Sequence, residues 1–133
     1  MLMSRSTRQG GFTLIELVIV IVLLGALTAT AVPIFTNLQD EANVAAEEAV
    51  IGNVRSAISL SYANAAVSGS PAFPSTLDSA SAGSAASDTN PFFGTVLVDP
   101  IVQDWSKNAS GHYVGPAGEA YAYDNSTGRL TKQ

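Results

Sequence analysis

The sequence contains no cysteine, and only one of its 133 residues is a histidine. Without thiols the chain can form neither a disulfide framework nor a thiolate metal site. The single histidine, His112, has no serine or cysteine nucleophile pattern nearby, so it is predicted to be an ordinary strand residue and not a catalytic base. These absences predict a protein that is not an enzyme and has no cofactor.

Calcium binding by oxygen ligands is a metal chemistry that the absence of thiols leaves open. The candidate ligands all lie in the C-terminal third: Asp99, Asp104, Asp124 and Asn125. Their spacing matches no calcium-binding loop, and short polar side chains of this kind commonly cap turns. We therefore predict turn capping and no metal site.

Basic residues are also scarce. The chain has 6 Lys and Arg against 11 Asp and Glu, for a formal charge of −5. Two of the basic residues, Arg5 and Arg8, belong to a short polar leader, and its removal would change the side-chain charge to −7. Nucleic-acid binding depends on neutralising phosphates with Lys and Arg. An acidic chain of this kind is therefore not expected to bind nucleic acid.

What the sequence does have is a long apolar run over residues 12–32, in which Glu16 is the only ionisable side chain. About twenty apolar residues suffice to cross the ~30 Å hydrocarbon layer of a bilayer as a helix. The centre of the run is apolar on every side, so no single stripe is set aside for a soluble core. The run predicts a helix that is covered by lipid or by other helices. The basic leader places the N-terminal end in the cytoplasm.

Glu16 needs a partner, because a carboxylate deep in an apolar helix costs on the order of 2.5–3.5 kcal/mol on insertion scales. One interpretation is that it lies close enough to the membrane surface to reach headgroups and water. The alternative requires cleavage between Gly11 and Phe12, which would create an α-amino group on Phe12. The amine of a neighbouring copy could then reach Glu16 and set an axial register between packed helices.

A different cleavage site competes with this one. The segment Ala29-Thr30-Ala31 has the small-residue pattern at which ordinary secretory signals are cut. Cleavage there would yield a small soluble protein that begins near Val32. It would leave the string around Glu16 unexplained.

The string Gly11-Phe12-Thr13-Leu14-Ile15-Glu16-Leu17, with its short basic leader and long apolar run, resembles the N-terminal signature of bacterial type IV pilins and of the related type II secretion pseudopilins. The resemblance is strong through about Pro33 and loose afterwards. Many pilins close a C-terminal loop with a disulfide, which this chain cannot form.

The resemblance implies a processing and assembly pathway. A prepilin peptidase would remove residues 1–11 and methylate the amine of Phe12. Glu16, with Thr13 beside it in the motif, would act in assembly by neutralising the Phe12 amine of an adjacent subunit. The stretch between Gly25 and Pro33 would be mildly kinked in a single subunit and would lose helical order in a filament.

The remaining residues are predicted to form a helix continuation, a loop and a sheet. An amphipathic pattern over residues 34–67 continues the helix, with Glu47 and Glu48 assigned to a solvated face. Residues 68–90 are rich in Ser, Ala and Gly and are predicted to be a surface loop held to the core by Phe73 and Leu77. Residues 91–133 are predicted to be a β-sheet head. Its expected strands are 92–98, a region around Trp105 and 112–114, and a hairpin formed by 120–123 and 129–131.

These expectations give an α+β protein: one long N-terminal helix, half of it in the membrane (residues 12–33), packed on a small antiparallel sheet. The predicted function is that of a structural subunit of a homo-oligomeric helical filament. It would be handled by a prepilin peptidase and by an assembly machinery in the inner membrane, and would then be displayed outside the cell. A major pseudopilin that binds calcium, and a membrane-tethered DNA receptor that would need a basic patch, remain the alternatives.

Overall fold

The computed structural model describes residues 10–133, so Arg5, Arg8 and most of the predicted leader 1–11 lie outside the described residues. The chain divides into two compact units, an N-terminal unit that ends at Gln39 and a sheet unit, Asp40–Gln133. One helix, α1 (Leu14–Val67), contributes to both units. Each unit is described by itself.

In the N-terminal unit, α1 is long and apolar enough over an 18-residue window to cross a membrane. It remains helical through Gly25 and Pro33. Its hydroxyl side chains donate back to the helix: Thr28 Oγ1 to the carbonyl of Leu24 at 2.8 Å and Thr30 Oγ1 to that of Leu27 at 2.9 Å. Bonds of this kind satisfy both hydroxyls without water, which is what a lipid environment requires.

The helix ends where the sequence predicts. Gly69 adopts a left-handed conformation with φ of 82°. The amide of Gly69 donates to the carbonyl of Ala66, and the amide of Ser70 donates to that of Ala65. This pair of bonds is a Schellman motif, which favours glycine because glycine has no Cβ to clash at positive φ.

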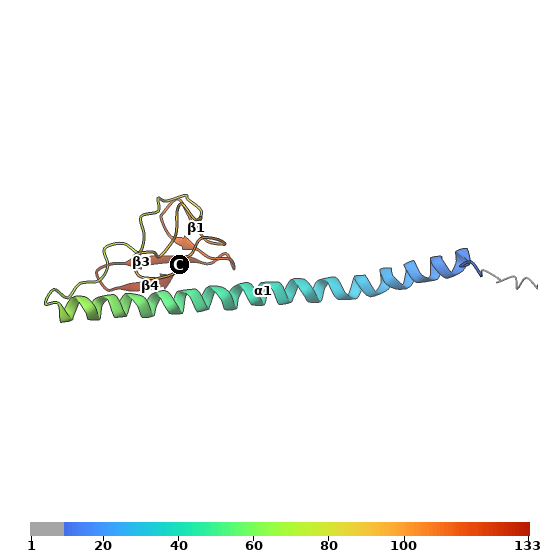
Figure 1. Ribbon diagram of the computed structural model, residues 1–133, viewed down its shortest axis with the longest axis horizontal. Helices are drawn as coiled ribbons and strands as arrows, with labels where there is room; N and C mark the ends of the chain where they lie inside the picture. Colours follow the sequence, from blue (N-terminus) through green and yellow to red (C-terminus); the bar gives the residue numbers. More distant parts are fainter. Residues whose placement is uncertain (1–9) are drawn as a thin grey trace, which may run out of the picture. The chain divides into compact units, whose positions relative to one another are not determined.

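The sheet unit contains four antiparallel strands in the order β1-β2-β3-β4. Figure 1 labels β1, β3 and β4. Their bounds are β1 (Ser106–Lys107), β2 (Tyr113–Val114), β3 (Ala120–Asp124) and β4 (Arg129–Lys132). The predicted hairpin is confirmed as β3 and β4, which pair Tyr123 with Leu130 and Asp124 with Arg129. The fold is therefore α+β, with one long helix and a small antiparallel sheet.

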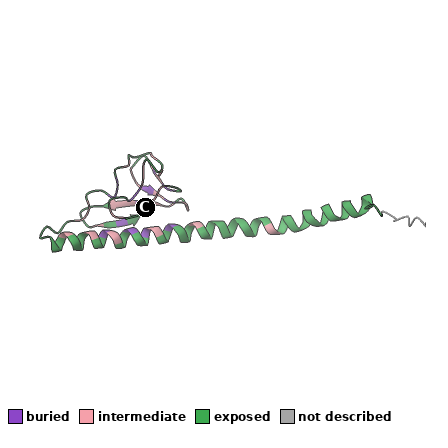
Figure 2. Cartoon of the chain, viewed as in Figure 1, coloured by how far each residue is buried: buried purple, intermediate pink, exposed green. Residues whose placement is uncertain are grey.

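The core of the sheet unit lies between α1 and the strands. The helix contributes Ile51, Val54 and Ile58, whose spacing places them on one face. The buried residues of α1 all belong to this unit (Figure 2). Partners from the rest of the unit are Leu77, Phe92, Phe93, Trp105, Tyr113, Tyr121 and Leu130. Leu77 and the half-buried Phe73 do hold the loop as predicted, and the ring of Phe73 stacks on that of Tyr62 with centroids 4.5 Å apart.

The prediction of a strand over residues 92–98 is wrong. Phe92 forms only an isolated bridge with Ile101, and the chain then turns, with the amides of Val96 and Leu97 both donating to the carbonyl of Phe93. Phe92 and Phe93 are both fully buried, whereas successive residues of a strand point to opposite faces. Phe93 has a φ of 61°, which breaks the extended conformation. The aromatic and β-branched residues here pack a turn into the core.

Candidate assembly site

The candidate site is the start of α1. Thr13 immediately precedes the helix, and Glu16 lies in its first turn. The amide and the hydroxyl of Thr13 donate to Glu16 Oε2 at 2.8 and 2.9 Å, and the amide of Glu16 lies 3.3 Å from Thr13 Oγ1. This reciprocal arrangement is a capping box, in which the N-cap side chain and the acid three residues later satisfy amides that have no helical partner.

The capping box gives Glu16 partners within its own chain but no counter-charge. Both of its bonds from Thr13 end on Oε2, and among the described residues no bond reaches Oε1. The ion pairs of residues 10–133 join Lys107 to Asp78 and Lys132 to Glu119. Glu16 is therefore oriented by hydrogen bonds while its charge stays uncompensated within the described chain.

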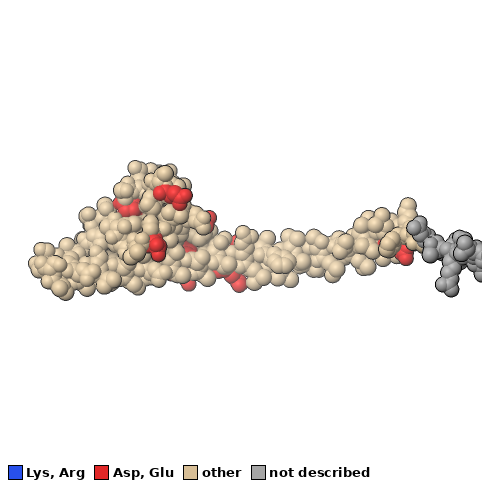
Figure 3. All heavy atoms as spheres, viewed as in Figure 1, with Lys and Arg blue, Asp and Glu red and all other residues tan. Residues whose placement is uncertain are grey.

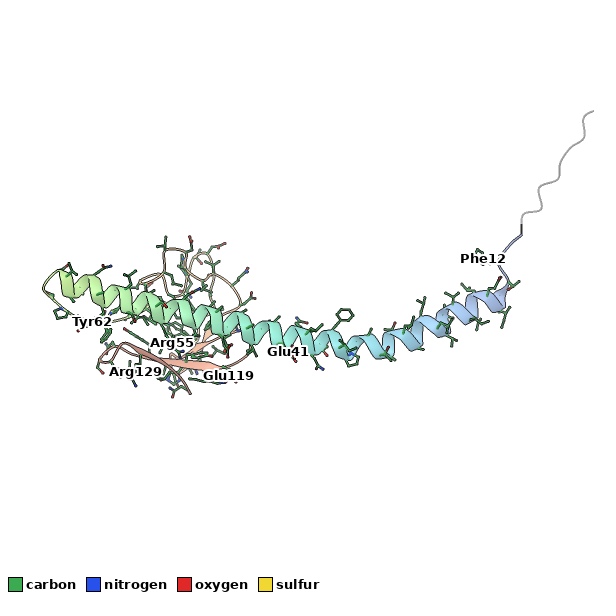
Figure 4. All side chains as sticks on the ribbon, turned by 90° about the horizontal axis from the view of Figure 1, so that it is seen from below. Phe12, Glu41, Arg55, Tyr62, Glu119 and Arg129 are labelled. Atoms are coloured by element: carbon green, nitrogen blue, oxygen red, sulfur yellow. The ribbon has the colours of Figure 1, made fainter. Side chains whose placement is uncertain are left out.

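The surface around Glu16 is apolar and uncovered. Phe12, which precedes the helix, is 95% exposed (Figure 4), and Leu17 and Leu27 are both more than 60% exposed. A single soluble chain cannot leave a continuous apolar surface of this kind in water without strong association. The exposed apolar surface of the N-terminal unit therefore fits surroundings of lipid or of other apolar helices.

Gly11 and Phe12, the predicted cleavage site, lie just before Thr13 at the start of the helix, and both are exposed. Gly25 and Pro33 lie within α1, in helical conformation. The predicted loss of helical order concerns an assembled filament and stays a prediction.

Sequence reasoning missed a second acidic position. Glu47 was expected on a solvated face but is 2% exposed. The hydroxyl of Tyr121 donates to its Oε1 and the amide of Ala117 to its Oε2, both at 2.9 Å. Burial, followed by the hydrogen bond with Glu47, raises the pKa of Tyr121 to about 12. The helical pattern gave no sign of this, because both partners lie at least 70 residues away in the sequence.

Two of the calcium candidates, Asp124 and Asn125, make hydrogen bonds within the fold. Asp124 caps the turn between β3 and β4, where Oδ1 accepts from the amide and hydroxyl of Ser126 and Oδ2 accepts from the hydroxyl of Thr127. Within residues 10–133, no group of three or more acidic or histidine side chains is placed to hold a metal. His112 is half-buried and contributes its backbone to the turn capped by Asn108.

Comparison with known proteins finds a match over the segment that contains Thr13 and Glu16. Residues 6–32 match the prokaryotic N-terminal methylation motif. Over 58 residues the chain is 52% identical to the type IV narrow pilus major component PilA5 of Thermus thermophilus, an alignment that covers 44% of this chain. The alignment covers 50% of that relative, so the chain spans about half of its length. No solved structure matches the chain.

Proposed function

From the methylation motif, the relative and the α+β fold, which together support a type IV pilin, we propose that this chain polymerises into a type IV pilus filament. The leader, residues 1–11, is removed between Gly11 and Phe12 by a prepilin peptidase, which then methylates the new amine. The subunit resides in the inner membrane as a precursor and is displayed outside the cell as a filament.

The observation that carries the proposal is the uncovered apolar helix of the N-terminal unit. In the precursor this surface is covered by lipid, and in a filament it is covered by the same helix of other subunits. Burial of apolar surface contributes ~25 cal/mol per Å2, so a helix of this kind packed among copies gives a filament that resists dissociation in water.

Glu16 supplies the register in this proposal. Thr13 holds Oε2, so the carboxylate has a fixed direction and Oε1 is available to the Phe12 amine of an adjacent subunit. A charge-assisted bond in an apolar filament core is strong, because water does not compete for either partner. A subunit docked one helical turn out of register would leave the Glu16 carboxylate and the Phe12 amine unpaired. The cost of two unpaired charges favours the correct register.

The proposal also assigns roles to the remaining segments. The membrane segment, residues 12–33, forms the filament core, and Gly25 and Pro33 lower helix stability enough for local melting when subunits pack. Residues 34–67 continue the helix, residues 68–90 connect it to the head, and the sheet of residues 91–133 forms the filament surface. The assembly machinery of the inner membrane would extract each subunit.

The specific work of the fibre, whether adhesion, motility or DNA uptake, would be decided by its surface. Three of the four cations of the described chain are engaged: Arg55 donates to the carbonyl of Leu130, Lys107 binds Asp78, and Lys132 pairs with Glu119. The face drawn in Figure 3 shows acidic side chains and no basic ones. We therefore propose adhesion or motility ahead of direct DNA binding by this subunit.

The test is Glu16→Ala in the native host. We expect the precursor to insert in the membrane and to be cleaved, while fibres in sheared material, counted by electron microscopy, are lost or strongly reduced. Glu48→Ala, an exposed acid of the sheet unit, is the matched control and should leave fibre yield unchanged. Normal yield from Glu16→Ala, or a mature N-terminus near Val32 in place of Phe12, would overturn the proposal.

A further inference from the structure

The sheet unit contains a buried ion pair that the filament proposal does not use. Lys107 Nζ of β1 lies 2.5 Å from Oδ1 of Asp78, in the segment between α1 and β1. The two side chains are 8% and 1% exposed. The ammonium also donates to the carbonyl of Ala80 at 2.8 Å, which fixes its position.

The surroundings of this pair are aromatic. Lys107 Nζ lies 5.5 Å from the ring centroid of Phe92 and 4.7 Å from that of Tyr113. A buried pair of ions in apolar surroundings is expensive to desolvate. Transfer of one proton from the ammonium to the carboxylate gives a neutral amine and a neutral acid, which cost less to bury.

Backbone donors polarise the carboxyl group of Asp78. The amide of Ala80 donates to Oδ1 at 3.0 Å and the amide of Phe93 to Oδ2 at 3.2 Å. The positive φ of Phe93 holds its amide in this direction, a backbone conformation that residues other than glycine rarely adopt. Amide donors fixed on an oxygen that gains negative charge stabilise a tetrahedral intermediate.

Tyr113 adds a neutral donor. Burial, and then the charge of Asp78, raise the pKa of Tyr113, so its hydroxyl stays protonated. It therefore adds no further charge to the site.

We propose that Lys107 and Asp78 condense into an intramolecular amide that cross-links β1 to the segment after α1. One proton passes from Nζ to Oδ1, and the Nζ lone pair then attacks Cγ to form the new bond. A second Nζ proton passes to Oδ1, the Cγ–Oδ1 bond breaks, and water leaves. Oδ2 becomes the amide oxygen and Nζ keeps one hydrogen. No oxidant, reductant or activated co-reactant is needed.

The released water can leave through a cavity beside the pair, and the bond would stabilise the sheet unit. A cavity of about 350 Å3 borders Asp78, Lys107 and Tyr113 and opens to solvent. The bond would close a loop between positions 29 residues apart, in a chain that has no cysteine to form a disulfide. A covalent link of this length removes conformational freedom from the unfolded chain, as a disulfide does. The inference concerns the sheet unit alone and does not depend on filament assembly.

The test is peptide mass spectrometry of the full chain, extracted in detergent, denatured and digested with trypsin. Between Arg55 and Arg129 the only cleavage site is Lys107, and trypsin does not cut after an acylated lysine. We expect one peptide covering residues 56–129, lighter than its sequence by one water. Separate peptides 56–107 and 108–129 at full mass would overturn the proposal.

Four variants distinguish the cross-link from other sources of water loss. Asp78→Ala and Lys107→Met should restore full mass, whereas Asp124→Ala, outside the pair, should keep the cross-link. Cyclisation of Asp78 onto its own backbone would also release water, but it would persist in Lys107→Met, and that result would overturn the proposal. Asp78→Asn preserves the shape of the site and should release ammonia in place of water. The mass deficit should also appear when the chain is made in an unrelated host, since no other protein takes part.

Discussion

The hydroxyl of Tyr121 donates a 2.9 Å hydrogen bond to Oε1 of Glu47, so a carboxylate on α1 holds the central strand β3. The other oxygen binds the amide of Ala117 in the turn before β3. Glu47 is thus satisfied by two donors that lie far from it in the sequence. The bond fixes how the helix and the sheet of the sheet unit pack on each other.

Replacing Glu47 with alanine should destabilise the sheet unit by on the order of 3 kcal/mol, because it leaves the buried hydroxyl of Tyr121 and the half-buried amide of Ala117 without an acceptor. Glu48→Ala removes the same charge from the exposed neighbouring position and should have little effect. Urea unfolding of the full chain in detergent, followed by near-UV circular dichroism from Trp105, would measure both. Equal midpoints for the two variants would contradict the role assigned to Glu47.

Gly128→Ala should be more damaging than Gly111→Ala. Both glycines have positive φ, 67° and 80°, so both substitutions introduce backbone strain of about 1 kcal/mol. Only at Gly128 would the new Cβ also meet another side chain, the ring of Phe73. That clash should add about 1–3 kcal/mol. The difference between the two melting temperatures isolates the steric contribution, and no difference would show that the ring of Phe73 moves away freely.

Thr13→Val removes the hydroxyl of the capping box and preserves side-chain shape. It should loosen the first turn of α1 by about 1 kcal/mol and reduce fibre yield less than Glu16→Ala does, because the charge of Glu16 remains. Thr30→Val, which removes a hydroxyl bonded to Leu27 in the middle of the helix, is the control. Amide exchange in micelles, measured over residues 14–17, should rise for Thr13→Val only. Unchanged exchange would argue against the capping box.

The turn capped by Asp124 should lose stability in acid. Bonds from the hydroxyls of Ser126 and Thr127, with the amide of Ser126, lower the pKa of Asp124 from 3.8 to about 2. A carboxylate with a lowered folded-state pKa stabilises the fold above about pH 4, and that contribution disappears as the pH falls towards 2. The effect is small because Asp124 is exposed.

The measurement is the melting temperature of wild type and Asp124→Ala between pH 6 and pH 2, values chosen to bracket the ordinary carboxyl pKa of about 3.9. The two curves should converge as the acid group becomes protonated. Asp99→Ala, an aspartate outside the turn, should run parallel to wild type. Curves that stay apart at the lowest pH would show that Asp124 acts through packing and not through its charge.

The features that could be predicted from the sequence are those decided by neighbouring residues. The apolar run, the helix end at Gly69 and the hairpin around Asp124 each depend on residues within a few positions, so composition and turn chemistry suffice. The capping box also has a local signal, Thr13 followed by Glu16 three residues later.

The features that were missed depend on residues far apart in the chain. The apolar residues 92–98 satisfy a strand pattern, yet Phe92 and Phe93 are both buried in the core. Two successive residues of a strand cannot point to the same side, so the chain turns here. Glu47 occupies a polar position in the helix pattern, and only Tyr121 and Ala117 make its burial possible. Nothing near Asp78 in the sequence indicates that Lys107 will lie against it.

The engagement of Arg55, Lys107 and Lys132 within the fold has a consequence for how whole fibres meet. Acidic side chains outnumber basic ones in the sheet unit, so filaments built from such heads would be rods of like charge, which repel one another. In dilute buffer, where electrostatic screening extends ~30 Å at 0.01 M salt, they should stay dispersed, whereas at 0.15 M, where it shortens to about 8 Å, they can lie side by side. Lateral bundling of the fibres would then follow the salinity of the medium.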